Sequence, residues 1–125
     1  MKKILIIDND RDVLDVMQEA LGYEGFDVTI VESTDNINLL VKSVNPHLVI
    51  IDYLLGDRNG GELCHEIKSD QATDKLPVIL FSAYPRVLNS LGTYGCDAFI
   101  PKPFDLDTLL NQVHSLIERS PIYEC

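Results

Sequence analysis

Four polar residues of this sequence have side chains suited to chemistry, and each follows a short apolar run. They are Asp8 after residues 4–7, Asp52 after 48–51, Ser82 after 78–81 and Lys102 after 98–101. Runs of this length, rich in Ile and Val, predict strands buried on both faces of a parallel sheet. The carboxyl ends of such strands meet at one edge, where open α/β sheets bind ligands. Two carboxylates, a hydroxyl and an ammonium gathered there would suit a divalent cation and a phosphoryl group.

The elements that must position these residues alternate between strand and helix along the whole chain. The predicted strands are residues 3–7, 27–31, 48–51, 78–81 and 97–100. A helix is predicted after each strand, and three of these helices span about 11–21, 86–94 and 106–118. The helix after the second strand is capped by Thr34 or Asp35 and ended by Asn45-Pro46. The helix after the third strand has Leu63 and Ile67 facing inward. This alternation means parallel strands, right-handed crossovers and helices on both faces of the sheet. We therefore predict one α/β domain with a doubly wound five-stranded parallel sheet, in which a glycine-rich loop follows the third strand.

Length and charge narrow the class of protein further. A chain of 125 residues suits a single domain. Its formal net charge of −10 argues against direct binding to nucleic acid or an anionic membrane, because phosphate contacts need Lys and Arg. No apolar run is long enough to span a bilayer, and the N-terminus lacks the pattern of a signal peptide. We expect a cytoplasmic protein.

Neither the cysteines nor the histidines show the spacing of a metal site. They are Cys64, Cys96 and Cys125, and His47, His65 and His114. An odd number of scattered cysteines predicts reduced thiols in a reducing compartment. We expect structural or surface roles for the histidines.

The chain resembles the receiver (CheY-like) domain of two-component response regulators over essentially its whole length. The matching residues are Asp8-Asn9-Asp10 after the first strand, Asp52 with Gly60 eight positions on, Ser82-Ala83 after the fourth strand, and Lys102-Pro103-Phe104 after the fifth. The resemblance implies a flavodoxin-like (βα)5 fold with strand order 2-1-3-4-5. It also implies a receiver domain over residues 1–120, with 121–125 as a tail or linker stub. Such a domain is a signalling phosphoacceptor, not an enzyme, and catalyses only its own phosphorylation and dephosphorylation.

By this resemblance, Asp52 is the phosphoacceptor whose carboxylate attacks the phosphorus of a phosphohistidine or a small phosphodonor. Mg²⁺ held by Asp8, Asp52 and the backbone carbonyl of Leu54 would bridge to a phosphoryl oxygen. The metal site departs from the family pattern at Asn9, where a second acid commonly binds the metal. An amide oxygen can still bind Mg²⁺ but brings no charge, so we expect weaker binding. Asp10 either compensates through water or caps the first helix.

The remaining phosphate contacts and the switch also follow from the resemblance. Lys102 would supply a positive charge to one phosphoryl oxygen, while the Ser82 hydroxyl and the Ala83 backbone N–H bind the others. Ser82 and Phe99 stand at the switch positions, although Phe99 fits plain core packing equally well. The Lys102-Pro103 bond is expected to be cis, as in relatives.

The partners implied by the resemblance are a histidine kinase or phosphotransfer protein and a downstream effector that the sequence does not identify. The kinase would dock on the first helix and the loop after the fifth strand. The fourth helix, fifth strand and fifth helix would form the output face, which is also a candidate homodimer surface. The sequence leaves open whether the chain is a complete regulator or a receiver from a larger protein.

Three other functions compete with this interpretation. A degenerate receiver would act by binding alone, and Asn9 is the reason to consider it. A haloacid-dehalogenase-like phosphatase would share the start Asp8-Asn9-Asp10 but needs Thr or Val where Asp12 stands, and a later acidic motif. A flavodoxin-like cofactor binder would need a Ser/Thr/Gly-rich phosphate loop after the first strand, where the acids would repel a flavin phosphate.

Overall fold

Five parallel strands form the centre of the structure, a computed structural model that describes residues 1–56, 58–83 and 95–119. The strands are β1 (Lys3–Ile7), β2 (Asp27–Val31), β3 (Leu48–Asp52), β6 (Val78–Ser82) and β7 (Ala98–Pro101). Their order is β2-β1-β3-β6-β7, and every neighbouring pair is parallel. With β6 and β7 as the fourth and fifth strands, the predicted flavodoxin-like sheet and its strand order are confirmed.

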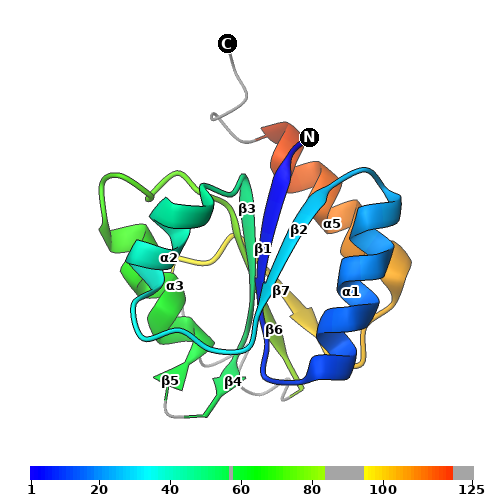
Figure 1. Cartoon of the computed structure of the whole chain (residues 1–125), viewed down its shortest axis with the longest axis horizontal. Coiled ribbons are helices and arrows are strands. Elements are labelled where there is room, and N and C mark those ends of the chain that lie inside the picture. The colour runs from blue at the N-terminus through cyan, green and yellow to red at the C-terminus, as the bar shows by residue number, and fades with distance from the viewer. Residues whose placement is uncertain (57, 84–94, 120–125) are drawn as a thin grey trace.

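Helices cover both faces of this sheet (Figure 1). They are α1 (Arg11–Tyr23), α2 (Ile37–Val44), α3 (Gly60–Ser69) and α5 (Leu106–Arg119). In the view of Figure 1, α1 and α5 lie on one side of the strands and α2 and α3 on the other, which makes a three-layer molecule. The predicted helix over 86–94 lies outside the described residues, as does the predicted tail 121–125.

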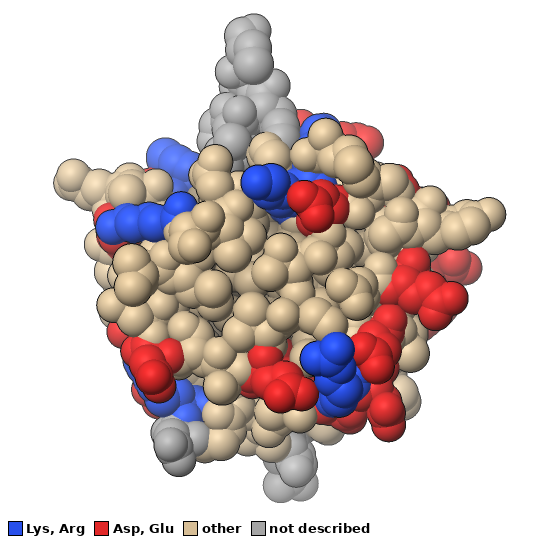
Figure 2. Space-filling model, viewed as in Figure 1, with Lys and Arg blue, Asp and Glu red and all other residues tan. Residues whose placement is uncertain are grey.

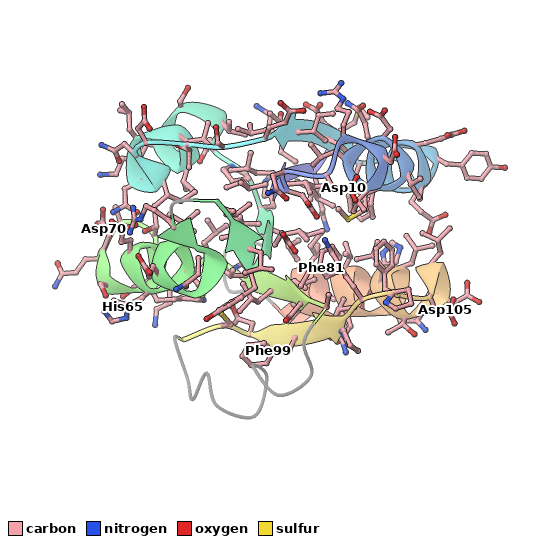
Figure 3. The ribbon with its side chains drawn as sticks, turned by 90° about the horizontal axis from the view of Figure 1, so that it is seen from below. Asp10, His65, Asp70, Phe81, Phe99 and Asp105 are labelled. Carbon is pink, nitrogen blue, oxygen red and sulfur yellow. The ribbon has the colours of Figure 1, made fainter. Side chains whose placement is uncertain are left out.

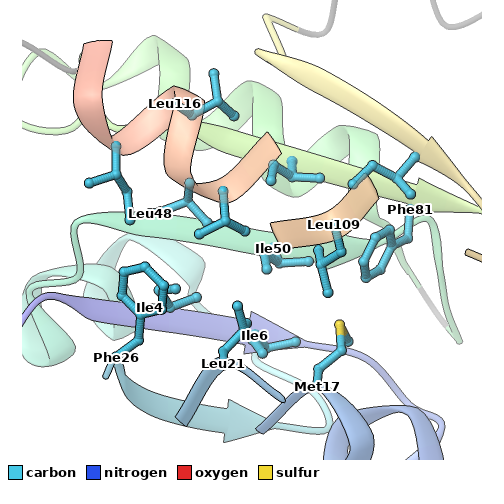
Figure 4. Packing of buried hydrophobic residues seen from close by; sticks show 14 of the residues in the cluster. Ile4, Ile6, Met17, Leu21, Phe26, Leu48, Ile50, Phe81, Leu109 and Leu116 are labelled. Atoms are coloured by element: carbon cyan, nitrogen blue, oxygen red, sulfur yellow. The ribbon is translucent and has the colours of Figure 1, made fainter. Parts of the chain in front are cut away.

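Each face of the sheet has its own hydrophobic cluster. Ile4 and Ile6 of β1 point toward α1 and α5, where they join Met17 and other buried residues (Figure 4). Leu5, between them, points the other way into a cluster with Ile67 of α3. Successive strand residues face opposite sides, so a strand covered on both faces is apolar throughout. Each fully buried Leu or Ile contributes about 1.5–3 kcal/mol, and the two clusters together hold the strand ends in place.

Capping side chains set where α1 and α2 begin. The Asp10 carboxylate accepts hydrogen bonds from the backbone N–H groups of Asp12 and Val13, so Asp10 is the N-cap of α1. The cap of α2 is Asn36, and the prediction of Thr34 or Asp35 was wrong. Thr, Asp and Asn are all good caps, so local sequence did not distinguish among them.

The loop after β3 contains structure that the sequence did not predict. Two short strands, β4 (Leu54–Leu55) and β5 (Arg58–Asn59), pair antiparallel there. Asn59 then caps α3: its side chain accepts the Glu62 N–H and donates to the Glu62 carboxylate.

Among the residues described, no helix is long and apolar enough to cross a membrane.

Candidate functional site

The four predicted site residues lie at the ends of neighbouring strands. Asp8 directly follows β1, Asp52 ends β3, Ser82 ends β6 and Lys102 directly follows β7. The register pairs Ile7 with Ile51, so the next residues, Asp8 and Asp52, stand side by side. The sheet therefore brings all four to its carboxyl edge.

Lys102 joins the two aspartates. Its Nζ lies 2.8 Å from Oδ2 of Asp8 and 2.9 Å from Oδ1 of Asp52. The other oxygen of Asp8 accepts the Asp10 backbone N–H at 2.9 Å. The side chains of Asp8, Asp52 and Lys102 are only 0%, 8% and 17% exposed. This nearly buried group thus holds two carboxylates against one ammonium.

The surroundings shift the acid–base equilibria of Asp52 and Lys102. Burial raises the pKa of Asp52, and the negative charge of Asp8 adds to this, while hydrogen bonds from Lys102 and the Leu54 backbone oppose it. For Lys102, burial alone would lower the pKa, but hydrogen bonds to Asp8 and Asp52 outweigh it and the net shift is upward. The lysine is therefore held as an ammonium. The charged form of Asp52 is less stabilised than it would be in water, so a further positive partner would stabilise this carboxylate.

The Lys102 ammonium lies over one of two stacked aromatic rings, whose role the sequence pattern did not predict. Phe81 and Phe104 are stacked with ring centroids 5.0 Å apart, and the Lys102 Nζ lies 5.8 Å from the Phe81 centroid. Figure 3, which looks at the carboxyl edge of the sheet, shows Phe81 near its middle. This geometry permits a cation–π contact and restricts where the lysine head can sit. The available signal was an aromatic residue directly before Ser82 and another two positions after Lys102.

Gly60 allows α3 to begin against the end of β3. A Cβ atom placed on Gly60 would collide with the backbone carbonyl oxygen of Asp52 and lie 2.8 Å from Cγ2 of Ile51. The Gly60 N–H also donates to the carbonyl of Tyr53 at 2.7 Å. The helix therefore packs directly against the backbone that carries the Asp52 side chain, and only glycine leaves room for this contact.

The other predicted site residues differ in their burial. Ser82 is buried, and its carbonyl accepts the Lys102 N–H at 2.7 Å, while Ala83 after it is exposed. Leu54 is 48% exposed, and Asn9 is exposed beside Asp8. Phe99 is partly buried and packs against the cluster on the α2 and α3 side. The Lys102-Pro103 bond is cis, as predicted.

The donors at this edge fit Mg²⁺ only if uncharged oxygens complete the set. No three His, Cys, Asp or Glu side chains gather in a metal-binding arrangement within residues 1–56, 58–83 and 95–119. Asp8 and Asp52 supply carboxylate oxygens, and the predicted additions are the amide of Asn9 and the carbonyl of Leu54. All of these are hard oxygen donors of the type that Mg²⁺ prefers. The chemistry of the donor set is therefore compatible with Mg²⁺, with fewer charges than a three-acid site. Figure 2 shows acidic side chains along the lower rim of the molecule, toward the carboxyl ends of the strands.

A groove opens next to this group. It has a volume of about 520 Å³ and runs between α1 and the segment after β7. Its walls are mostly apolar and include Val13, Val16, Pro103 and Phe104, and Lys102 also reaches it. Val16 is 50% exposed, so the groove presents apolar surface beside the carboxylates.

Comparisons with known proteins agree with this architecture. The family model described as the response regulator receiver domain matches residues 4–114. The DNA-binding dual master transcriptional regulator RpaA of Synechocystis sp. is 29% identical over 96% of this chain and 51% of its own length. The chain spans about half the length of the curated relatives that it matches.

Solved structures give the same result. A CheY-like response regulator receiver domain protein from Methanospirillum hungatei superposes with a TM-score of 0.85 and 27% identity, covering 94% of both chains. The response regulator TrrA from Thermotoga maritima, solved in complex with Mg(2+)-BeF, gives a TM-score of 0.78 and 28% identity over 93% of this chain and 99% of its own.

Proposed function

Because the chain belongs to the response regulator receiver domain family, a family of signalling proteins, we propose that it is a phosphoacceptor that takes a phosphoryl group onto Asp52. The observation that carries the proposal is the contact of one lysine Nζ with both Asp8 and Asp52 at the carboxyl edge. A structural ion pair would need one carboxylate, whereas this group retains an uncompensated negative charge suited to a further cation.

In the proposed reaction, a carboxylate oxygen of Asp52 attacks the phosphorus of a phosphohistidine. An O–P bond forms, the P–N bond breaks, and the histidine nitrogen leaves with its electron pair. Lys102 neutralises one oxygen of the transferred group, and the Ser82 hydroxyl and Ala83 N–H donate to the others. Phosphoryl transfer depends mainly on such positioning and charge neutralisation. Mg²⁺ bound by Asp8, Asp52, Asn9 and the Leu54 carbonyl would neutralise charge on the same phosphoryl oxygens.

The proposed phosphodonor is a histidine kinase or phosphotransfer protein. The groove next to Lys102 is its proposed docking site. The groove lies on α1 and the segment after β7, the surface that the family resemblance implies. Val16 and Phe104 offer apolar contacts there, and Lys102 lines the same groove. A partner held in it would be next to the reacting group.

The proposed switch pairs Ser82 with Phe99. Phosphorylation would favour a pre-existing state in which the Ser82 hydroxyl binds phosphate and the Phe99 ring turns inward behind it. Phe99 is only partly buried, which leaves room for a change in its packing. The response would reach partners through β7 and α5, together with the predicted fourth helix, which lies outside the described residues.

Intact-protein mass after incubation with acetyl phosphate and Mg²⁺ tests the proposal. The parent chain should gain one phosphoryl group of roughly 80 Da, whereas Asp52→Asn should gain none. No gain in either folded protein would overturn the proposal and favour a degenerate receiver that acts by binding alone. An equal gain in both would place the phosphate on another residue.

The same assay tests the contribution of Asn9. In a Mg²⁺ titration, Asn9→Asp should reach half-maximal phosphorylation at a lower Mg²⁺ concentration, because a carboxylate adds charge to the metal site. Saturation of both proteins at the same concentration would remove Asn9 from the proposed ligand set.

A further inference from the structure

Two cysteines that lie far apart in the sequence meet in the fold. The Sγ atoms of Cys64 and Cys96 are 2.7 Å apart, although the two residues are 32 positions apart in the sequence. Cys64 is buried in α3, and Cys96 is partly exposed just before β7. Both are free thiols that contribute to the hydrophobic cluster on the α2 and α3 side. The phosphoacceptor chemistry uses neither of them.

Neighbouring contacts hold the two sulfur atoms in register. Lys68, one turn after Cys64, forms an ion pair with Asp97 at 2.8 Å and donates to the Leu76 carbonyl at 2.7 Å. Asp97, directly after Cys96, also accepts the Val78 backbone N–H at 2.8 Å. Residues flanking both cysteines are thus anchored to each other and to the start of β6.

Gly95 brings the segment before Cys96 close to α3. Its φ of +84° lies in the left-handed region, and an added Cβ would be only 2.9 Å from Cγ of Lys68. The backbone on the Cys96 side therefore packs directly on the lysine stem of α3. The approach of the two sulfurs follows from packing on both sides of the pair.

We propose that Cys64 and Cys96 are a redox modification site, at which a peroxide converts the two thiols into an intramolecular disulfide. A disulfide bond is about 2.05 Å long, so the two sulfur atoms need to approach by only about 0.7 Å. The bond would join α3 to the start of β7. This proposal does not depend on the phosphoacceptor function.

The chemistry proceeds in two balanced steps with hydrogen peroxide as oxidant. The Cys96 thiolate attacks one peroxide oxygen, the O–O bond breaks, and the released hydroxide takes a proton to become water. The Cys64 sulfur then attacks the sulfenic sulfur of Cys96 and loses its proton, the S–O bond breaks, and the departing hydroxide takes that proton and leaves as a second water. The two thiols together lose two electrons, and the peroxide gains them.

Exposure assigns the order of these steps. Cys96 is the member of the pair that solvent reaches, so it meets the peroxide first, while Cys64 is fully buried. The hydrogen bond with Cys96 and burial also raise the pKa of the Cys64 thiol, so at neutral pH it is a protonated thiol and a poor nucleophile toward peroxide. Cys64 is therefore the resolving residue.

Peptide mapping of the full chain tests the proposal directly, because trypsin places each cysteine in a different peptide. These are residues 59–68, 87–119 and 120–125. The chain is first treated with hydrogen peroxide and then alkylated in denaturant. Apart from the mass of any added alkyl group, it should be about 2 Da lighter than the fully reduced chain, because the disulfide replaces two S–H groups. Peptides 59–68 and 87–119 should be linked, peptide 120–125 should be alkylated, and a thiol reductant should restore all three free thiols.

Two variants provide the controls. Cys125→Ser should form the same link, since it leaves the pair intact, and Cys96→Ser should leave peptide 59–68 fully alkylated. In the parent and Cys125→Ser, oxidation should also raise the midpoint of thermal unfolding, because the link constrains the unfolded chain. Three alkylatable thiols after peroxide treatment, links through Cys125 alone, or a sulfinic acid on Cys96 without a link would each overturn the proposal.

Discussion

Asp8, Asp52 and Lys102 form a cluster with one more negative than positive charge, almost out of contact with water. Such a cluster is costly unless its charges are balanced, because burial penalises each charge that lacks a partner. The imbalance is therefore a property expected of a binding site and not of a stabilising ion pair. Its cost should be measurable in the absence of any ligand.

We predict that Asp52→Asn is more stable than the parent at neutral pH in a metal-free buffer. The substitution leaves Lys102 with Asp8 as a neutral pair, so the midpoint of thermal unfolding should rise by a few degrees. Because the pKa of Asp52 is raised by burial, the folded parent binds its proton more tightly than the unfolded chain does. The contribution of Asp52 to the parent's free energy of unfolding should therefore fall as pH rises from about 3.9, the value for an unfolded aspartate, through the raised pKa.

Thermal unfolding from pH 4 to pH 8 checks this prediction. The advantage of Asp52→Asn should be largest at neutral pH and should shrink toward pH 4. Asp74→Asn, at an exposed position, is the control and should change the midpoint little at any pH. An Asp52→Asn protein less stable than the parent at pH 7 would contradict the charge argument.

At the scale of elements, the site depends on how closely α3 approaches the end of β3. Gly60 begins the helix where a side chain would meet the Asp52 backbone, and Asn59 caps the same turn. The position of Asp52 is therefore coupled to the start of this helix. Gly22, near the end of α1, has no such neighbour, since nothing lies within 4 Å of a Cβ added there.

We predict different effects for alanine at these two glycines. Gly60→Ala should lower the free energy of unfolding by about 1–3 kcal/mol, the usual cost of overpacking, and should slow phosphorylation of Asp52. Gly22→Ala should be neutral or stabilise by up to about 1 kcal/mol, because alanine favours helix more than glycine does. Urea unfolding followed by circular dichroism measures both. Equal effects at the two positions would show that the close contact at Gly60 has no energetic weight.

At the scale of the whole molecule, one sheet carries two separate hydrophobic clusters. Leu109 of α5 lies in the cluster on the α1 and α5 side, and Leu63 of α3 lies in the other. Both leucines are almost fully buried. The clusters share the strands between them, so neither layer should unfold while the other stays folded.

We predict that Leu109→Ala and Leu63→Ala each lower the free energy of unfolding by about 2–5 kcal/mol. In both variants, unfolding should remain a single transition, with coincident curves from far-ultraviolet circular dichroism and tyrosine fluorescence. Two separated transitions in either variant would mean that the layers unfold independently.

Much of this architecture is encoded locally and was predictable from the sequence. Apolar runs of four residues predicted four of the five parallel strands, because a strand covered on both faces is apolar at every position. The remaining strand, residues 27–31, includes Asp27 and Thr29 and was predicted without such a run. The polar residue after each run then predicted which side chains meet, since parallel strands end at a common edge. This pattern and the family resemblance were sufficient to select Asp8, Asp52 and Lys102 as candidates.

The tertiary structure decided how side chains from distant segments pair. It selected Asn36 over two equally good caps, paired β4 with β5, and stacked Phe81 on Phe104 beneath the site. It also brought Cys64 to Cys96, which the spacing of three cysteines did not predict. Apolar character and its periodicity belong to neighbouring residues, so they can be recognised along the sequence. Contacts across the fold depend on the register of strands and on packing between layers, which no local stretch of sequence contains.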